Sequence, residues 1–122
     1  MKVLLSIKPE FAERIFDGSK KYEFRKTIFK KLNVKTVVVY ASSPVKRVIG
    51  EFDIDTILSD TPENLWKETH AFSGISEEFF FDYFSERSVG FAIKVKKVRR
   101  YQTPRCLRTR YKVNPPQSFC YV

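Results

Sequence analysis

The chain has 122 residues, which suits one compact domain, and we expect a single domain over residues 1–122. Its 43% hydrophobic and 16% aromatic residues exclude a disordered chain and predict a soluble, globular one. No apolar run approaches the roughly 20 residues that span a bilayer, and no signal peptide is visible, so the expected location is cytoplasmic, without membrane contact. Cys106 and Cys120 lack metal-ligand spacing, which predicts two free thiols, no metal site and no cofactor.

The charged residues fall into blocks along the chain. The formal net charge is +9, divided as +8 over residues 1–50, −9 over residues 51–86 and +10 over residues 87–122. If the two basic ends meet in the fold, they form one basic surface, and such a surface attracts the phosphate backbone of a polyanion. The acidic block at 51–86 instead suggests a protein partner. Alternatively, the helices carry acids and the strands carry bases without functional consequence.

In chain order, the first part of the sequence alternates between strand and helix patterns. Residues 2–7 form an apolar run typical of a buried strand. Pro9 opens a short amphipathic helix, which Gly18 ends as a C-terminal cap. Residues 22–25 alternate between aromatic and charged side chains and predict a strand with one polar face. Residues 27–34 are typical of an exposed basic loop.

The middle and end of the chain predict a sheet interrupted by two helices. Strands are expected at 35–41 and 48–55, joined by a Ser-Ser-Pro turn, with Gly50 marking a bulge or a close backbone approach. Thr61 and Ser76 are in position to cap two helices. The remaining expectations are a strand at 89–101 with a bulge near residue 97, a basic connection without a clear element at 103–116, and a final strand at 119–122. Together these elements predict an α+β fold in which a mixed, mainly antiparallel sheet of about six strands closes as a barrel.

One motif connects this pattern with a known family. Gly18, Lys20, Glu23 and Arg25 form the sequence Gly-x-Lys-x-x-Glu-x-Arg, which resembles the signature of the ASCH domain. The likeness extends to Tyr40-Ala41-Ser42-Ser43-Pro44, to Gly50-Glu51-Phe52 and to the closing residues 116–119, so the chain looks like a small member of that family consisting of little beyond the domain. The resemblance implies a PUA-like β-barrel and a cleft, lined by the signature, that binds RNA or a nucleotide in connection with transcription or translation.

The chemistry of the signature suits a nucleotide. Lys20 and Arg25 offer donors to phosphate oxygens, whereas the Glu23 carboxylate accepts hydrogen bonds from a base amino group or holds Arg25 in place. Strict alternation puts Lys20 on the opposite face of the strand, so Lys20 must lie in the turn before it or be re-aimed by a bulge. The alternative interpretation is an ion-pair network on the surface of a barrel strand.

Further candidates for nucleic-acid contacts lie elsewhere in the chain. They are Ser42, Ser43, Lys46, Arg47, Arg108 and Arg110. The two serines are equally typical of a simple turn, and the basic pair that follows them is equally typical of a solvated edge. Tyr40 and Trp66 suit the core better than a stacking platform. Gln117 and Ser118 are candidates for the floor of the cleft.

The sequence favours a binding module over an enzyme. His70 is the only histidine and lies in the acidic block, where an exposed helix position is the better interpretation. Some small relatives resemble an amidohydrolase of N4-acetylcytidine, whose signature carries a threonine nucleophile where this chain has Glu23, and a carboxylate cannot perform the same acyl transfer. We therefore predict a non-catalytic RNA-binding module. Hydrolysis of a modified nucleoside, or RNA cleavage, is the alternative, with Lys20 and Glu23 as candidate catalytic residues.

Overall fold

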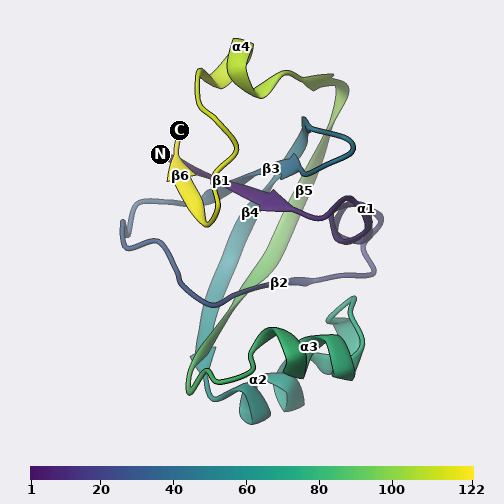
Figure 1. Ribbon diagram of the computed structural model, residues 1–122, viewed down its shortest axis with the longest axis vertical. Coiled ribbons are helices and arrows are strands. Elements are labelled where there is room, and N and C mark those ends of the chain that lie inside the picture. The colour runs from purple at the N-terminus through teal and green to yellow at the C-terminus, as the bar shows by residue number, and fades with distance from the viewer.

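Six strands form one curled sheet in the computed structural model, which describes residues 1–122 (Figure 1). The strands are β1 (Lys2–Ile7), β2 (Tyr22–Arg25), β3 (Thr36–Ala41), β4 (Arg47–Asp60), β5 (Gly90–Arg105) and β6 (Phe119–Tyr121). The helices are α1 (Pro9–Asp17), α2 (Pro62–Thr69), a 3-10 turn η1 (His70–Phe72), α3 (Glu77–Tyr83) and α4 (Leu107–Tyr111). The strand order is β2-β5-β4-β3-β1-β6, in which only β1 and β3 are parallel. The predicted α+β class with a mixed, mainly antiparallel sheet is confirmed.

The central strands β1 and β3 are buried on both faces. Along β1, Val3 and Leu5 belong to the largest core cluster, which packs against α1, whereas Leu4 belongs to a cluster on the opposite face. In β3, Val39 and Tyr40 divide in the same way. Burial on both faces explains why these strands are continuous apolar runs rather than alternating ones, and it confirms the core position expected for Tyr40.

Strands β4 and β5 are longer than the sequence pattern indicated and are bent by bulges. The pairing register shifts where Asp53 faces Lys97 and Ile54 faces Val95, which confirms the predicted bulge near residue 97. A second shift lies at Gly50, where an added Cβ would stand 2.6 Å from the Arg99 carbonyl oxygen, so the close approach is also confirmed. The strand predicted to end at residue 55 continues to Asp60 because this part of β4 still pairs with β5.

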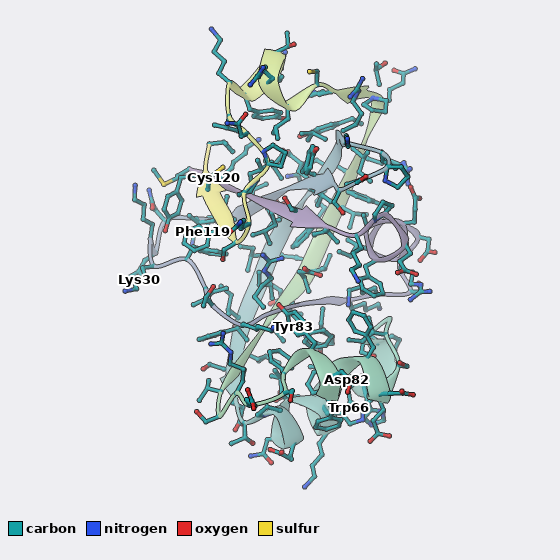
Figure 2. The ribbon with its side chains drawn as sticks, viewed as in Figure 1. Lys30, Trp66, Asp82, Tyr83, Phe119 and Cys120 are labelled. Atoms are coloured by element: carbon teal, nitrogen blue, oxygen red, sulfur yellow. The ribbon has the colours of Figure 1, made fainter.

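The two-helix insertion between β4 and β5 packs its own small core against the sheet. Thr61 and Ser76 cap α2 and α3 as predicted, each accepting a hydrogen bond from a backbone N–H three residues on. Phe80 of α3 and Phe84, the residue that follows this helix, meet Phe24 of β2 edge-on, at centroid distances of 5.1 and 6.2 Å. Trp66 lies at this end of the molecule (Figure 2), half-buried against Phe80.

The C-terminal connection contains a helix that the sequence pattern did not reveal. Residues 103–116 were expected to lack a clear element, yet β5 runs on to Arg105 and α4 follows. Leu107 is the one buried side chain of α4. It completes the cluster that contains Leu4 and Tyr40, on the face of β1 and β3 that points away from α1, which we call the outer face. A single apolar anchor among arginines gives no helical periodicity, which explains the missed element.

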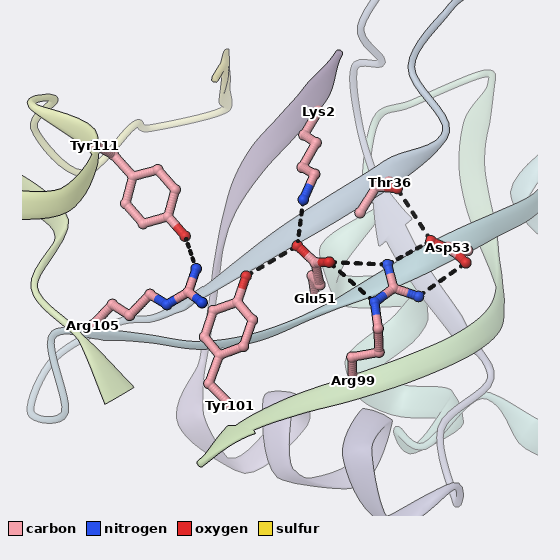
Figure 3. Close-up of polar contacts among 8 residues, drawn as sticks. All are labelled: Lys2, Thr36, Glu51, Asp53, Arg99, Tyr101, Arg105 and Tyr111. Carbon is pink, nitrogen blue, oxygen red and sulfur yellow. Dashed lines mark hydrogen bonds and ion pairs between the residues drawn. The ribbon is translucent and has the colours of Figure 1, made fainter. Parts of the chain in front are cut away.

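A polar cluster joins β1, β4 and β5 on this outer face (Figure 3). The buried Glu51 carboxylate accepts hydrogen bonds from Lys2 Nζ at 2.9 Å and from the Tyr101 hydroxyl at 3.0 Å. Arg99 donates to Glu51 at 3.0 Å and forms a two-pronged contact with Asp53 at 2.7 and 3.0 Å. Much of the charge at the start of the acidic block is therefore neutralised within the fold.

The sheet remains a half-barrel, because β2 and β6 are its two unpaired edges. Side chains bridge the gap between them. Arg25 of β2 donates to the Ser118 carbonyl at 2.6 Å and to the Ser6 carbonyl at 3.4 Å, and the hydroxyls of Thr27 and Ser118 lie 3.0 Å apart. The two chain ends meet at the same side, where Lys2 and Val122 exchange backbone hydrogen bonds (Figure 1). The basic N-terminal and C-terminal segments therefore adjoin.

Candidate functional site

A cleft of about 270 Å³ lies where the half-barrel is open. Its walls come from the end of β1, from α1, from β2 and the residues before it, from α3 and the turn that precedes it, and from the segment before β6. The lining residues are Ser6, Ile7, Lys8, Phe11, Lys20, Glu23, Phe24, Arg25, Ile75, Phe79, Tyr83 and Gln117. The three charged residues of the signature thus line one cleft.

Lys20 lies in the turn before β2, one of the two placements that the strand alternation required. Its side chain is 2% exposed, and Nζ lies 4.8 Å from the centre of the Phe24 ring and 5.5 Å from that of Phe11. The only hydrogen bond of the Lys20 ammonium runs to the Ser73 carbonyl oxygen, at 2.7 Å. Burial lowers the pKa of Lys20 to about 8, with Glu23 opposing and Arg14 reinforcing the shift. A buried lysine of this kind is an ammonium ready to bind an anion or to give up a proton.

Glu23 and Arg25 form a pair at the same cleft. Arg25 Nη1 lies 3.3 Å from Glu23 Oε2, and both side chains are about nine-tenths buried, with 9% of Glu23 and 12% of Arg25 exposed. Arg25 is also committed to the carbonyls of Ser6 and Ser118. Arg25 therefore holds the carboxylate of Glu23 in position and links β2 to β1 and to the segment before β6. The pair is buried, unlike the surface ion pair that was the alternative interpretation of the sequence.

Aromatic side chains that sequence reasoning did not select as site residues complete the cleft. Phe11 and Phe79 meet edge-to-face at 5.1 Å, from α1 and α3. Tyr83 lies on the side of α3 that faces β2 (Figure 2), and its ring carries Lys26 Nζ 4.8 Å from its centre. Burial raises the pKa of the Tyr83 hydroxyl. The sequence signal for these residues is the number of aromatic side chains in α3, which exceeds what one buried helix face can accommodate and so indicates that some of them line a surface hollow.

The other predicted residues lie outside the cleft. Ser42, Ser43 and Lys46 form the exposed or half-exposed turn between β3 and β4, and Arg47 begins β4. The Ser42 N–H donates to the carbonyl of Ile7 at 3.0 Å, so this turn runs along the cleft edge without lining it. Arg108 and Arg110 are exposed on α4, at the end of the molecule opposite α2 and α3 (Figure 1). Gln117 lines the cleft, while Ser118 contributes its carbonyl to Arg25.

Several remaining expectations concern groups away from the cleft. Cys106 and Cys120 are free thiols, the first exposed and the second half-buried in β6. His70 is exposed beside Trp66, at a ring distance of 6.0 Å. No group of three or more His, Cys, Asp or Glu side chains is arranged to hold a metal ion. None of the helices is both long and apolar enough to cross a membrane.

Comparison with known proteins gives one consistent family. A family model described as "ASCH domain" matches residues 5–103. A Zymomonas mobilis protein named "ASCH domain-containing ribonuclease" is 29% identical over 99% of this chain and 84% of its own length. The crystal structure of ASCH from Zymomonas mobilis superposes with a TM-score of 0.90, at 29% identity, over 99% of this chain and 87% of the other.

Other similar proteins are much longer than this chain. A Ureaplasma parvum protein named "ATP synthase subunit alpha" is 31% identical over 98% of this chain, and the match spans 15% of that protein. A second, named "Large ribosomal subunit protein uL22", is 28% identical over 98% of this chain and 39% of its own length. The likeness to these two proteins is therefore confined to a segment of each.

Proposed function

This chain belongs to the ASCH domain family, and from that premise we propose that it binds single-stranded RNA with one nucleotide in the cleft. The observation that carries the proposal is the buried Lys20. Desolvating an ammonium is unfavourable, and Lys20 makes one hydrogen bond in return. A lysine held in this way between aromatic rings in a cleft indicates a functional role, because burial and perturbed pKa values gather at binding and catalytic sites.

The cleft matches a nucleotide in size and chemistry. Its volume of about 270 Å³ lies just below the roughly 300–1,000 Å³ typical of small-ligand sites, which leaves room for about one base with its sugar. Phe11, Phe79 and Tyr83 offer ring faces and edges to a base, and Glu23 offers an acceptor to an exocyclic amino group. Lys8 and Lys20 supply positive charge for the phosphate. The basic turn at residues 42–47 and, at the far end of the molecule, α4 carry further positive charge outside the cleft.

Fluorescence anisotropy with a labelled single-stranded RNA tests the proposal. For a single strand, log K falls with log salt with a slope of about −0.7 for each phosphate contacted. Lys8 is exposed and only its backbone takes part in the start of α1, so Lys8→Ala should preserve the fold. We expect Lys8→Ala to reduce that slope by about 0.7 and the affinity by up to about fivefold. The matched control is Lys67→Ala, because Lys67 is exposed on α2 and lines no part of the cleft. The absence of RNA binding at low salt would refute the proposal.

RNA cleavage is a second candidate function, favoured by the ribonuclease name of the Zymomonas relative and by the lowered pKa of Lys20. In such a reaction the ribose 2′-oxygen attacks the adjacent phosphorus while the bond from phosphorus to the 5′-oxygen breaks. In the proposed step the Glu23 carboxylate takes the 2′ proton. The Lys20 ammonium, a stronger acid than an ordinary lysine, protonates the leaving 5′-oxygen. The products are a 2′,3′-cyclic phosphate and a free 5′-hydroxyl.

A gel assay with end-labelled RNA and the matching DNA separates cleavage from binding. We expect RNA alone to be cut, since DNA lacks the attacking 2′-hydroxyl, and Lys20→Met to abolish cutting while Lys21→Met does not. RNA left intact by the wild type, or cutting unchanged in Lys20→Met, would remove the second candidate and leave RNA binding standing. Incubating the same variants with N4-acetylcytidine and measuring the release of cytidine by chromatography checks the amidohydrolase alternative.

The proposal extends to the cellular role of the protein and to a protein partner. RNA binding by a small basic module suits a cytoplasmic role in transcription or translation, and the exposed acids of α2 and α3 suit a protein partner. Recovery of ribosomes or of RNA polymerase with the tagged protein tests both, and the acidic residues can then be neutralised in turn.

A further inference from the structure

A second hollow adjoins the cleft and shares a wall with it. It has a volume of about 560 Å³ and lies over α1 and the turn that leads into α3. Phe11, Ile75 and Phe79 line both hollows, so one continuous surface passes from the cleft, around the edge-to-face pair of phenylalanines, into this groove. Glu10, Arg14, Gly74 and Ser76 line the groove alone.

The groove has the chemical features of a site for a second base. Phe11 and Phe79 are half-buried and present ring surface to both hollows, and bases stack on such rings without strong sequence preference. A cation accompanies each ring, with Lys8 Nζ 5.2 Å from the centre of Phe79 and the Arg14 guanidinium 5.6 Å from the centre of Phe11. Arg14 uses one of its five N–H donors on the Gly74 carbonyl, at 2.8 Å, which leaves others free for a phosphate.

The groove lies where an RNA chain that leaves the cleft can place its next nucleotide. An RNA chain with one nucleotide in the cleft must leave it, and the next nucleotide lies one backbone repeat away. The shared phenylalanine wall makes the groove the immediate neighbour of the cleft, with Lys8 and Arg14 beside the two rings and Glu10 among the groove's lining residues. Glu10 repels a phosphate and accepts a hydrogen bond from a base amino group, which orients the base into the groove.

We propose that this groove is a second base-binding subsite, so that the protein reads two adjacent nucleotides rather than one. The inference rests on the proposed RNA binding in the cleft. Stacking on aromatic side chains contributes about 1–3 kcal/mol per base, which corresponds to about 5-fold to 150-fold in affinity. A dinucleotide should therefore bind about 5-fold to 150-fold more tightly than the matching mononucleotide.

Amide chemical shifts of the ¹⁵N-labelled protein locate each nucleotide separately. The probes are the four nucleoside 5′-monophosphates and the four corresponding 5′-phosphorylated homodinucleotides. We expect the monophosphates to shift the amides of residues 20–25, and the dinucleotides to shift those of Glu10 and Ser76, which line the groove alone, as well. If the monophosphates leave residues 20–25 unchanged, the proposed function itself fails. If the cleft responds but the dinucleotide adds neither affinity nor a shift in the groove, the second subsite alone is refuted.

A matched pair of variants at Ser76 gives an independent test. Ser76 caps α3 by accepting a hydrogen bond from the Phe79 N–H at 3.1 Å, and Asp and Asn cap helices equally well. Ser76→Asp adds a negative charge to the groove, whereas Ser76→Asn has the same size without charge. We expect the Asp variant to weaken dinucleotide binding about threefold to fivefold relative to the Asn variant, with a smaller effect on the monophosphate. Equal dinucleotide affinities for the two variants would overturn the proposal.

Discussion

The buried Lys20 makes a quantitative prediction about stability and pH. Burial lowers its pKa from 10.5 to about 8. Between these two values the unfolded chain keeps a proton that the folded chain has released, so the free energy of unfolding gains from Lys20 as the pH rises through this window. The difference between the two pKa values corresponds to about 3 kcal/mol, of which about 2.5 kcal/mol is regained between pH 7 and pH 10.

The perturbation is Lys20→Met, which keeps most of the side-chain volume and removes the titrating group. Urea unfolding of both proteins at pH 7 and at pH 10 gives two free energies for each, and other titrating groups largely cancel in the difference between wild type and variant. We expect the free energy of unfolding of the wild type, relative to that of the variant, to increase by about 2 to 3 kcal/mol from pH 7 to pH 10. The lost hydrogen bond to Ser73 does not imitate this gain, because a neutral amine still donates.

Lys21→Met is the control, because Lys21 neighbours Lys20 in the chain but is exposed. Its difference from the wild type should stay the same at both pH values. A Lys20→Met difference that also stays constant to within about 0.5 kcal/mol would refute the reasoning. The ammonium would then be solvated in the folded protein, and the argument for an acidic, functional lysine would fall with it.

Three further predictions concern the fold that holds the site. Gly50→Ala should destabilise the protein by about 1–3 kcal/mol in urea unfolding, because the new Cβ meets the Arg99 carbonyl at 2.6 Å; a neutral result would mean that β4 and β5 separate easily. Phe80→Ala should cost about 3–5 kcal/mol, and Phe81→Ala distinctly less because Phe81 is half-buried; equal losses would contradict the core assignment. Hydrogen bonds from Arg99 lower the pKa of Asp53 to about 2, so its stabilising effect is present above the unfolded value of 3.8 and lost as the pH falls toward 2. Asp53→Asn should therefore flatten the loss of stability between pH 5 and pH 2, and an unchanged acid profile would exclude this pair as its source.

Local patterns predicted most of the fold because its elements are marked by residues with fixed conformational roles. Gly18 ends α1 with φ 89°, and Thr61 and Ser76 cap their helices, so the helix boundaries could be read directly. The ends of β4 and β5 could not be predicted, because the length of each strand depends on its pairing with the other and not on alternation of apolar and polar residues. The helix α4 depends on one tertiary contact, through Leu107, which a window of sequence does not contain.

The site was predicted in part for the same reason. Lys20, Glu23 and Arg25 are close in sequence, so a short motif could bring them to one cleft. Phe11 and Phe79 come from helices 68 residues apart, and whether an aromatic lies on the core side or the cleft side of an amphipathic helix depends on how the helix is rotated. The contact of Arg25 across the gap between β2 and β6 could not be predicted from the sequence either, because its partner Ser118 is 93 residues away.

The meeting of Lys2 and Val122 has a consequence for how such a module is carried. A domain whose entry and exit lie side by side can be inserted into a surface loop of another protein without forcing that loop apart. The same geometry makes the chain suitable for circular permutation, with a short linker joining the old ends and new ends opened in the exposed loop at residues 30–33.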